Sequence, residues 1–329
     1  MAGPIETEKQ VYRRVLAQLA GLQGPAVQRV LQPLYDTNVQ WHGSYPHGDC
    51  EGLDAVVARF WLPLVRACPN LERQDDIVLS GLFEGARWVA STGHYVGTFV
   101  EEWLGIPPTG RVLNVRVGEF SRFSNGKIVE AYVIVDLVDV LRQAGIHPLR
   151  PALGLEDRVP APATQDGFES ADADDQTAQS LELVEQMIRG LMEYDGTGLA
   201  SMRMERFWHP RMMWYGPGGI GTTRGLDGFQ RQHQAPFLRA FPDRKGGNHK
   251  ARFAEGAYVA STGWPSVRAT HAGDGWLGLP ASGTRVGMRV MDFWRREGPW
   301  LVENWVFIDM ADLLAQMGHV DLMQCVTPP

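Results

Sequence analysis

The chain of 329 residues contains a long internal repeat. The octapeptide WLGIPPTG at 103–110 returns as WLGLPASG at 276–283, 173 positions later. At the same offset GLD at 52–54 falls on GLD at 225–227, and the whole of 111–145 aligns with 284–318 without a gap. VASTG at 89–93 matches VASTG at 259–263 with a slightly smaller shift. Agreement in order, spacing and residue type predicts two tandem copies of one domain of roughly 140 residues.

The repeat divides the chain into residues 1–149, a connection at 150–179, and residues 180–329. The connection reads RPALGLEDRVPAPATQDGFESADADDQTAQ and is rich in Pro, Ala and Asp with hardly any aromatic residue. Such a composition is typical of a flexible linker.

Each copy has helical spacing of apolar residues first and strand patterns afterwards. Helices are predicted at 9–32 and 53–67 in the first copy and at 178–195 and 226–240 in the second. Alternating runs predict strands at 86–99, 111–123 and 129–137, and at 257–263, 284–296 and 301–309. Short helices should end the copies at 137–144 and 310–317. This order predicts an α+β fold with N-terminal helices over a curved antiparallel sheet.

Composition limits the possible partners. A formal charge of −7 and a pI near 5.7 give no reason to expect nucleic acid or an anionic membrane as partner. The chain has no apolar run of about 20 residues, no secretory leader and no CxxC motif, so we expect a soluble cytoplasmic protein. Glycine-rich nucleotide loops are missing, and His42 with His47 finds no third spaced ligand, so neither a cofactor nor a metal is expected.

Two segments of the second copy resemble a known family. They are THAGDGWLGLPASG (270–283) and MDFWRREGPWLVENWVFIDMADLLAQMG (291–318). They are similar to the SnoaL-like polyketide cyclases of the NTF2-like superfamily, in a Thr-His-x-Gly run, a Gly-x-Pro-x-x-Gly turn and a Trp-x-x-x-Asp strand ending before Gln-x-Gly. The first copy keeps the turn but has Tyr132 for the strand tryptophan and GHYVG for the first run. The second copy is therefore the better preserved.

The resemblance implies two tandem NTF2-like cone domains, each with a pocket between sheet and helices. It also implies acid–base catalysis without a cofactor on a small apolar, often aromatic or carbonyl-bearing, substrate. NTF2-like domains usually pair sheet to sheet. The two fused copies are therefore expected to form an internal pseudo-dimer, and a further homodimer stays open.

The resemblance points to the ends of the last strands for catalysis, at Asp309 and, second, Asp136. A carboxyl group among aromatic residues on a half-buried strand has a raised pKa, which suits a general acid or base near neutral pH. The alternative is that each aspartate caps the short helix that follows it.

Asp292 and Glu119 occupy equivalent positions on the preceding strands, each at one end of an apolar stripe, where the acid could line a pocket or emerge at its rim. If Asp292 faced Asp309, the two like charges would keep one proton between them. His271 matches the family histidine and could polarise a carbonyl, or it could be a structural histidine.

Further side chains are expected to shape the pockets, although packing in the core is an alternative for the tryptophans. They are Trp214, Tyr215, Trp305, Tyr132, His42, His94 and Glu119.

These observations favour a SnoaL-like enzyme, a cyclase, isomerase or lyase that transfers protons. One alternative is a hydrolase of the epoxide type, which a pair of carboxylates with room for water would favour. The other is a ligand-binding or scaffold protein without catalysis, which a pocket closed by tryptophans would favour.

Overall fold

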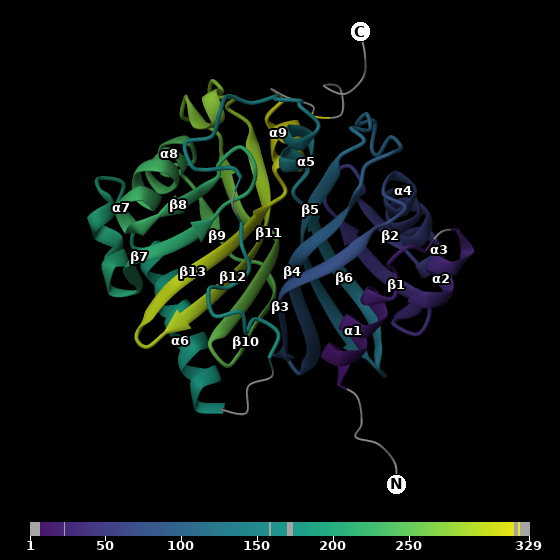
Figure 1. Cartoon of the computed structure of the whole chain (residues 1–329). Coiled ribbons are helices and arrows are strands. Elements are labelled where there is room, and N and C mark those ends of the chain that lie inside the picture. The colour runs from purple at the N-terminus through teal and green to yellow at the C-terminus, as the bar shows by residue number, and fades with distance from the viewer. Residues whose placement is uncertain (1–6, 23, 158, 170–173, 319–321, 323–329) are drawn as a thin grey trace.

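The computed structural model describes residues 7–22, 24–157, 159–169, 174–318 and 322. Two sheets face each other, and the helices lie mainly on the outer sides (Figure 1). We call the unit that runs from α1 to α5 domain 1, and the unit that runs from α6 to α9 domain 2. No helix among the described residues is long and apolar enough to cross a membrane.

The elements of domain 1 alternate between helix and strand before the long hairpins begin. They are α1 (Glu8–Ala17), α2 (Pro25–Leu31), β1 (Tyr35–Gly43), β2 (Asp49–Glu51), α3 (Leu53–Val56), the π-helical turn η1 (Val57–Trp61), α4 (Leu62–Ala67), β3 (Glu72–Phe83), β4 (Ala86–Thr98), β5 (Val112–Ser124), β6 (Lys127–Val135) and α5 (Leu137–Gln143).

Domain 2 repeats this order with a longer first helix. Its elements are α6 (Asp174–Leu191), η2 (Leu199–Met202), η3 (Met204–Arg206), β7 (Trp208–Tyr215), β8 (Thr222–Arg224), α7 (Gly225–Phe229), the π-helical turn η4 (Gln230–Gln234), α8 (Ala235–Ala240), β9 (Lys245–Gly246), β10 (His249–Glu255), β11 (Tyr258–Thr270), η5 (Trp276–Gly278), β12 (Arg285–Glu297), β13 (Trp300–Ile308) and α9 (Met310–Met317).

The strand order is β2-β1-β6-β5-β4-β3 in domain 1 and β10-β11-β12-β13-β7-β8 in domain 2, where β9 also pairs with β11. The structure confirms the α+β prediction of two helix-covered sheets. It corrects the prediction of purely antiparallel sheets, because β1 runs parallel to β6 and β7 runs parallel to β13. Four strands, β1, β3, β7 and β10, were not predicted from the sequence.

The inner faces of the two sheets pack against each other through aromatic side chains. Phe120 of β5 lies 5.5 Å from Phe293 of β12 and 6.1 Å from Phe253 of β10, measured between ring centroids. Tyr132 and Trp305, one from each last strand, are buried in the same layer. Each sheet therefore has two covered faces, one against the other sheet and one against its own helices.

The connection between the domains lies against both of them. The Trp305 indole donates to the Pro160 carbonyl at 2.8 Å, and the Val78 amide donates to the Gly167 carbonyl at 2.8 Å. Leu155 forms a β-bridge with Thr222. α6 begins at Asp174, inside the segment 150–179 that was expected to be a flexible linker. In its described part this segment is packed, because its backbone groups find partners on both domains.

The repeated octapeptide forms the same turn in both domains. Leu104 and Leu277 both have φ near +55°, and the glycine after each has φ near +80°. Leucine rarely adopts this left-handed conformation, so the tertiary structure must hold it. Trp103 and Trp276 are buried under the turns and supply that anchoring. The repeat therefore reflects a shared structural turn.

Candidate functional site

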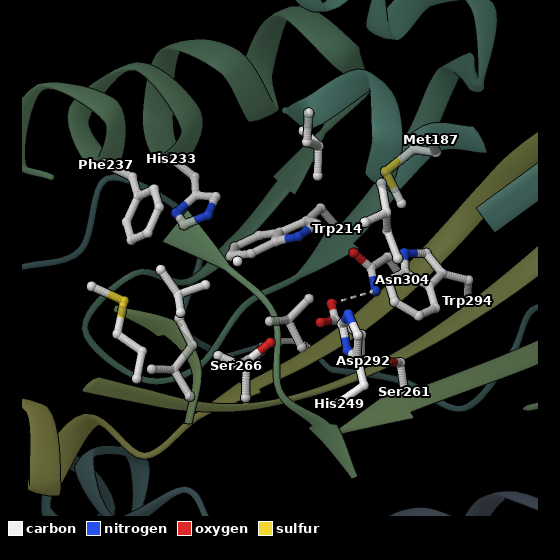
Figure 2. A pocket seen from close by; sticks show the side chains of 18 of the residues that line it. Met187, Trp214, His233, Phe237, His249, Ser261, Ser266, Asp292, Trp294 and Asn304 are labelled. Carbon is white, nitrogen blue, oxygen red and sulfur yellow. Dashed lines mark hydrogen bonds between the residues drawn. The ribbon is translucent and has the colours of Figure 1, made fainter. Parts of the chain in front are cut away.

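A largely apolar cavity, called the main cavity below, lies in domain 2 between the sheet and the helices that cover its outer side (Figure 2). Its volume is about 400 Å³, within the range of small-molecule sites. Met288, Val290, Asp292 and Trp294 line it from alternate positions of β12, and Asn304, Val306 and Ile308 do so from β13. The remaining walls come from α6, β7, α7, η4, α8 and the β9–β11 region.

Asp292 is the one carboxylate that lines this cavity in the described part of the chain. The Asn304 amide donates to Asp292 Oδ1 at 3.3 Å and to the Phe293 carbonyl at 3.1 Å, which fixes the amide beside the carboxyl group. Burial raises the pKa of Asp292 to about 7, although the Asn304 hydrogen bond and the Arg252 charge oppose the shift. A carboxyl group in this state can accept or release a proton near neutral pH.

Arg252 supplies a positive charge to the same end of the cavity. Its Nε donates to Ser261 Oγ at 3.3 Å, and its NH2 lies within 3.0 Å of the ring nitrogens of His249. Burial and the Arg252 charge together lower the pKa of His249 to about 4, so the imidazole is neutral. Among the described residues no carboxylate oxygen lies within 4 Å of the Arg252 guanidinium, whereas Arg73 is paired with carboxylates at that distance.

The opposite part of the cavity is largely apolar. The indole of Trp214 and the imidazole of His233 stack with ring centroids 4.2 Å apart and an interplanar angle of 19°. Phe237 lies next to His233, with ring centroids 5.6 Å apart. The π-helical turn η4 brings His233 to this wall, and such turns are frequent at functional sites. The wall offers flat surfaces for a planar ring.

The equivalent place in domain 1 is filled by a network around Glu119, the twin of Asp292. Tyr12 and Tyr95 donate to the Glu119 carboxylate at 2.6 and 2.7 Å. The Arg73 guanidinium is paired with the same carboxylate, and all four side chains are buried. The glutamate is therefore neutralised by a fixed partner, which Asp292 lacks.

Asp309 is not among the residues that line the main cavity, although its neighbour Ile308 is. It caps α9 by accepting from the Asp312 amide at 3.2 Å, and it accepts from Arg289 at 3.0 Å. It also accepts from the Tyr45 amide of domain 1 at 3.0 Å. Burial and the nearby Asp312 charge raise its pKa to about 6. The helix-capping interpretation of this residue therefore holds, and the carboxylate also links the two domains.

Asp136 makes the mirror-image contacts. It caps α5 through the Asp139 amide, accepts from the Gly218 amide of domain 2 at 3.0 Å, and lies 3.5 Å from Arg116. Gly218 follows Tyr45 by 173 positions, the spacing of the repeat. Asp136 lines a smaller polar cavity of about 260 Å³, where arginines and other acids surround it. Neither Asp136 nor Asp309 therefore lies in the pocket lined by aromatic residues that the resemblance implied.

The reason is which face of the last strand meets the cavity. Asp292 is paired across the sheet with Val306, so these two side chains share the cavity face. Trp305 points the other way, into the layer between the sheets, where it meets Tyr215 with ring centroids 5.1 Å apart. Tyr132 lies in the same layer. These three rings were expected to shape a pocket and instead join the domains; of the aromatic residues predicted for the pocket in domain 2, Trp214 lines the cavity.

The predicted histidines lie apart from the main cavity. His271 is buried against Phe241 and Trp276, and its Nδ1 accepts from the Ser282 amide at 3.3 Å, so it supports the octapeptide turn. His42 stacks on Tyr132, with ring centroids 4.6 Å apart. His94 lies 3.2 Å from Asp76 and lines the small polar cavity.

The cavity residues that were not predicted from the sequence include Asn304, Arg252 and His233. A comparison of the two copies could have found them. Asn304 stands where domain 1 has Ala131, and His233 stands where it has Phe60, both at the repeat spacing. Arg252 pairs with Ser261 as Val78 pairs with Ser91 in the shared VASTG run. In each case domain 2 has a polar side chain where domain 1 is apolar.

Comparison with protein families gives one match, which occurs twice. A family model described as SnoaL-like polyketide cyclase matches residues 25–144 and 200–317, which together make up more than half of the chain. No curated protein matches the chain.

Several solved structures are similar to single halves of the chain. A proposed SnoaL-like polyketide cyclase from Jannaschia sp. CCS1 is 22% identical, with 45% of this chain and 99% of that one covered and a TM-score of 0.37. AclR, a proposed hydroxylase from Streptomyces galilaeus, is 26% identical, with 44% and 83% covered and a TM-score of 0.35. IdmH, a proposed polyketide cyclase from Streptomyces antibioticus, is 20% identical, with 43% and 100% covered and a TM-score of 0.36.

Proposed function

Because the chain belongs to the SnoaL-like polyketide cyclase family, we propose that it is a cofactor-independent enzyme with its active site in the domain 2 cavity. The proposed reaction is proton transfer at a carbon next to a carbonyl group of a small, flat, mostly apolar metabolite. The observation that carries the proposal is the position of Asp292, a single carboxyl group of raised pKa in a largely apolar cavity with Arg252 near it.

Each polar residue has a role in the proposed step. Ionised Asp292 removes the proton, the electrons of the C–H bond form a C=C bond, and the π electrons of the carbonyl group move to its oxygen, which gives an enolate. Arg252 stabilises the negative oxygen, since a desolvated positive charge acts strongly in a cavity that excludes water. Asn304 holds the carboxyl group in position. The enolate then takes the proton back at another atom, as in an isomerase, or attacks a second carbonyl and closes a ring, as in a cyclase.

The alternative functions have less support. A hydrolase would need a second carboxylate beside Asp292 to hold and activate water, and the lining of the described cavity has one. The non-catalytic alternative fits domain 1, because Arg73 and two tyrosines fill the place around Glu119. We therefore assign catalysis to domain 2 and a supporting role to domain 1.

The test is hydrogen–deuterium exchange at the carbon next to the carbonyl, followed by NMR in D₂O over a panel of aryl ketones and aromatic β-keto esters. The wild type should exchange at least one compound above the buffer rate, and the rate should rise with pH through about 7. Asp292→Asn should lower it roughly 10²–10⁴-fold, because general base catalysis is lost.

Asp309→Asn is the matched control for this experiment. It removes a buried carboxylate of similar pKa that does not line the cavity, so exchange should stay within about threefold of the wild type. Full exchange by Asp292→Asn, or a panel in which the wild type never exceeds the buffer blank, would contradict the proposal.

A further inference from the structure

His233 has a place in the cavity wall that the proposed proton transfer does not explain. Its Nδ1 is buried without a hydrogen-bond partner in the described part of the chain. The ring lines the cavity beside Trp214 and Phe237, and Figure 2 draws no hydrogen bond to it from the other lining residues.

Domain 1 shows that this position does not need a polar ring. Phe60 occupies the same place in the equivalent π-helical turn η1, 173 positions earlier. It packs against Trp41 with ring centroids 5.5 Å apart. A buried imidazole nitrogen without a partner costs free energy that a phenyl ring does not cost. Packing alone therefore favours phenylalanine, and the histidine of domain 2 needs another reason.

The state of the imidazole restricts what it can bind. Burial lowers the pKa of His233 to about 3, so the ring is neutral in the physiological range. A neutral imidazole has one donor and one acceptor and no charge. It suits a hydroxyl or carbonyl group and gives no advantage to an anion. Its stack on Trp214 holds the ring in one orientation.

His233 is also separated from the proposed reacting end. Figure 2 shows His233 and Phe237 on one side of the Trp214 indole, and Asp292 with Asn304 on the other. A planar ligand lying along the indole could reach both ends. The two ends would then recognise different groups of one molecule.

We propose that His233 hydrogen-bonds a hydroxyl or carbonyl group at the far end of the substrate. The substrate class is then a flat ring system with oxygen substituents at both ends. This inference rests on the proposed function, because it takes the domain 2 cavity as the substrate site and places the reacting oxygen near Arg252.

Two probes test this on the full chain by titration calorimetry at pH 7.5. One is 2-naphthoic acid, whose carboxylate suits Arg252, and the other is 6-hydroxy-2-naphthoic acid, which adds a distant hydroxyl group. The wild type should bind the hydroxylated acid about 5–10-fold more tightly, the usual effect of one hydrogen bond. In His233→Phe this ratio should fall to about 1, with the affinity for 2-naphthoic acid within about twofold of the wild type.

Phe60→His is the control, since it makes the reverse change at the equivalent site and should leave the ratio unchanged. His233→Phe should fold, because phenylalanine already occupies the twin position, and its melting temperature should equal or exceed that of the wild type. The proposal is overturned if His233→Phe keeps the wild-type ratio, if Phe60→His abolishes it equally, if the wild type binds both acids with equal affinity, or if it binds neither.

This experiment is independent of turnover. Normal exchange by Asp292→Asn would remove the catalytic assignment, and the affinity ratio would still report on His233. If Asp292→Asn loses exchange but His233→Phe keeps the wild-type affinity ratio, only the recognition role of His233 is removed.

Discussion

Asp292 and Glu119 occupy the same position of the repeat and differ in what faces them. Glu119 is surrounded by Arg73, Tyr12 and Tyr95, whereas Asp292 faces a cavity with Asn304 as its hydrogen-bond donor. Removing one partner of a buried ion pair leaves the other charge uncompensated. Replacing the acid by its amide should therefore lower stability at Glu119 and lower catalysis at Asp292.

Glu119→Gln should lower the free energy of unfolding by about 3 kcal/mol, because Arg73 keeps its charge without its main counter-ion. Deuterium exchange by the folded variant should match the wild type. Urea denaturation followed by circular dichroism measures the first quantity. A Glu119→Gln variant that is as stable as the wild type would contradict the stabilising role of Glu119. A folded variant that has lost exchange would contradict the assignment of catalysis to Asp292 alone.

The raised pKa of Asp292 also predicts a pH effect on stability. The folded chain keeps a proton on this group up to about pH 7, while the unfolded chain loses it near the ordinary value of 3.8. The folded state binds more protons between these values, so the stability contribution falls as pH rises through this window. Asparagine does not titrate. The stability of Asp292→Asn relative to the wild type should therefore increase by about 2.5 kcal/mol between pH 5 and pH 8.

Urea denaturation of both proteins at the two pH values measures this difference. Asp136 and Asp309 titrate in both proteins, and their contributions cancel. A difference that is constant with pH would mean that Asp292 has an ordinary pKa.

At the scale of elements, the last helices of both domains begin at a carboxylate that also joins the domains. Asp136 accepts from the amide at the start of α5 and from Gly218 of domain 2, and it lies 3.5 Å from the Arg116 guanidinium. Asp309 repeats this arrangement at α9 with Tyr45 and Arg289. Each carboxylate therefore couples the end of a strand, the start of a helix and a loop of the other domain.

Asp136→Ala should lower the free energy of unfolding by about 3 kcal/mol or more, because the helix loses its cap and buried Arg116 loses its counter-ion. Asp157→Ala is the control. Asp157 also pairs with an arginine, Arg142, but its side chain is 71% exposed, so the change should cost less than about 1 kcal/mol. Equal effects of the two substitutions in urea denaturation would argue against the buried link.

For the whole molecule, the layer between the sheets makes the two domains depend on each other. Phe120→Ala should cost about 3–5 kcal/mol, since it removes a ring that domain 1 packs against Phe253 and Phe293 of domain 2. Circular dichroism and tryptophan fluorescence should still report a single, coincident urea transition at a lower midpoint. Leu82→Ala, at a side chain that is 66% exposed, should leave the midpoint nearly unchanged. Two separate transitions would show that the domains unfold independently.

Much of the architecture could be predicted because it depends on local patterns. Apolar residues alternate along the long hairpin strands and recur at helical spacing in the helix at 310–317, with few interruptions. β1 and β7 were not recognised as strands, because each pairs in parallel with a strand about 90 residues further along the chain. Such a pairing leaves no hairpin turn in the sequence.

The repeated residues alone were sufficient to establish two copies of a helix-covered sheet, the shared turn, and an acid at position 292 on an apolar stripe of its strand. They could not show which face of the last strand meets the cavity, because both faces are buried and alternation looks the same on either. That choice placed Trp305 and Tyr132 between the sheets and made Asp136 and Asp309 links between domains. It was decided by distant segments, the partner sheet and the loops at Tyr45 and Gly218, whose contacts exist only in the folded chain.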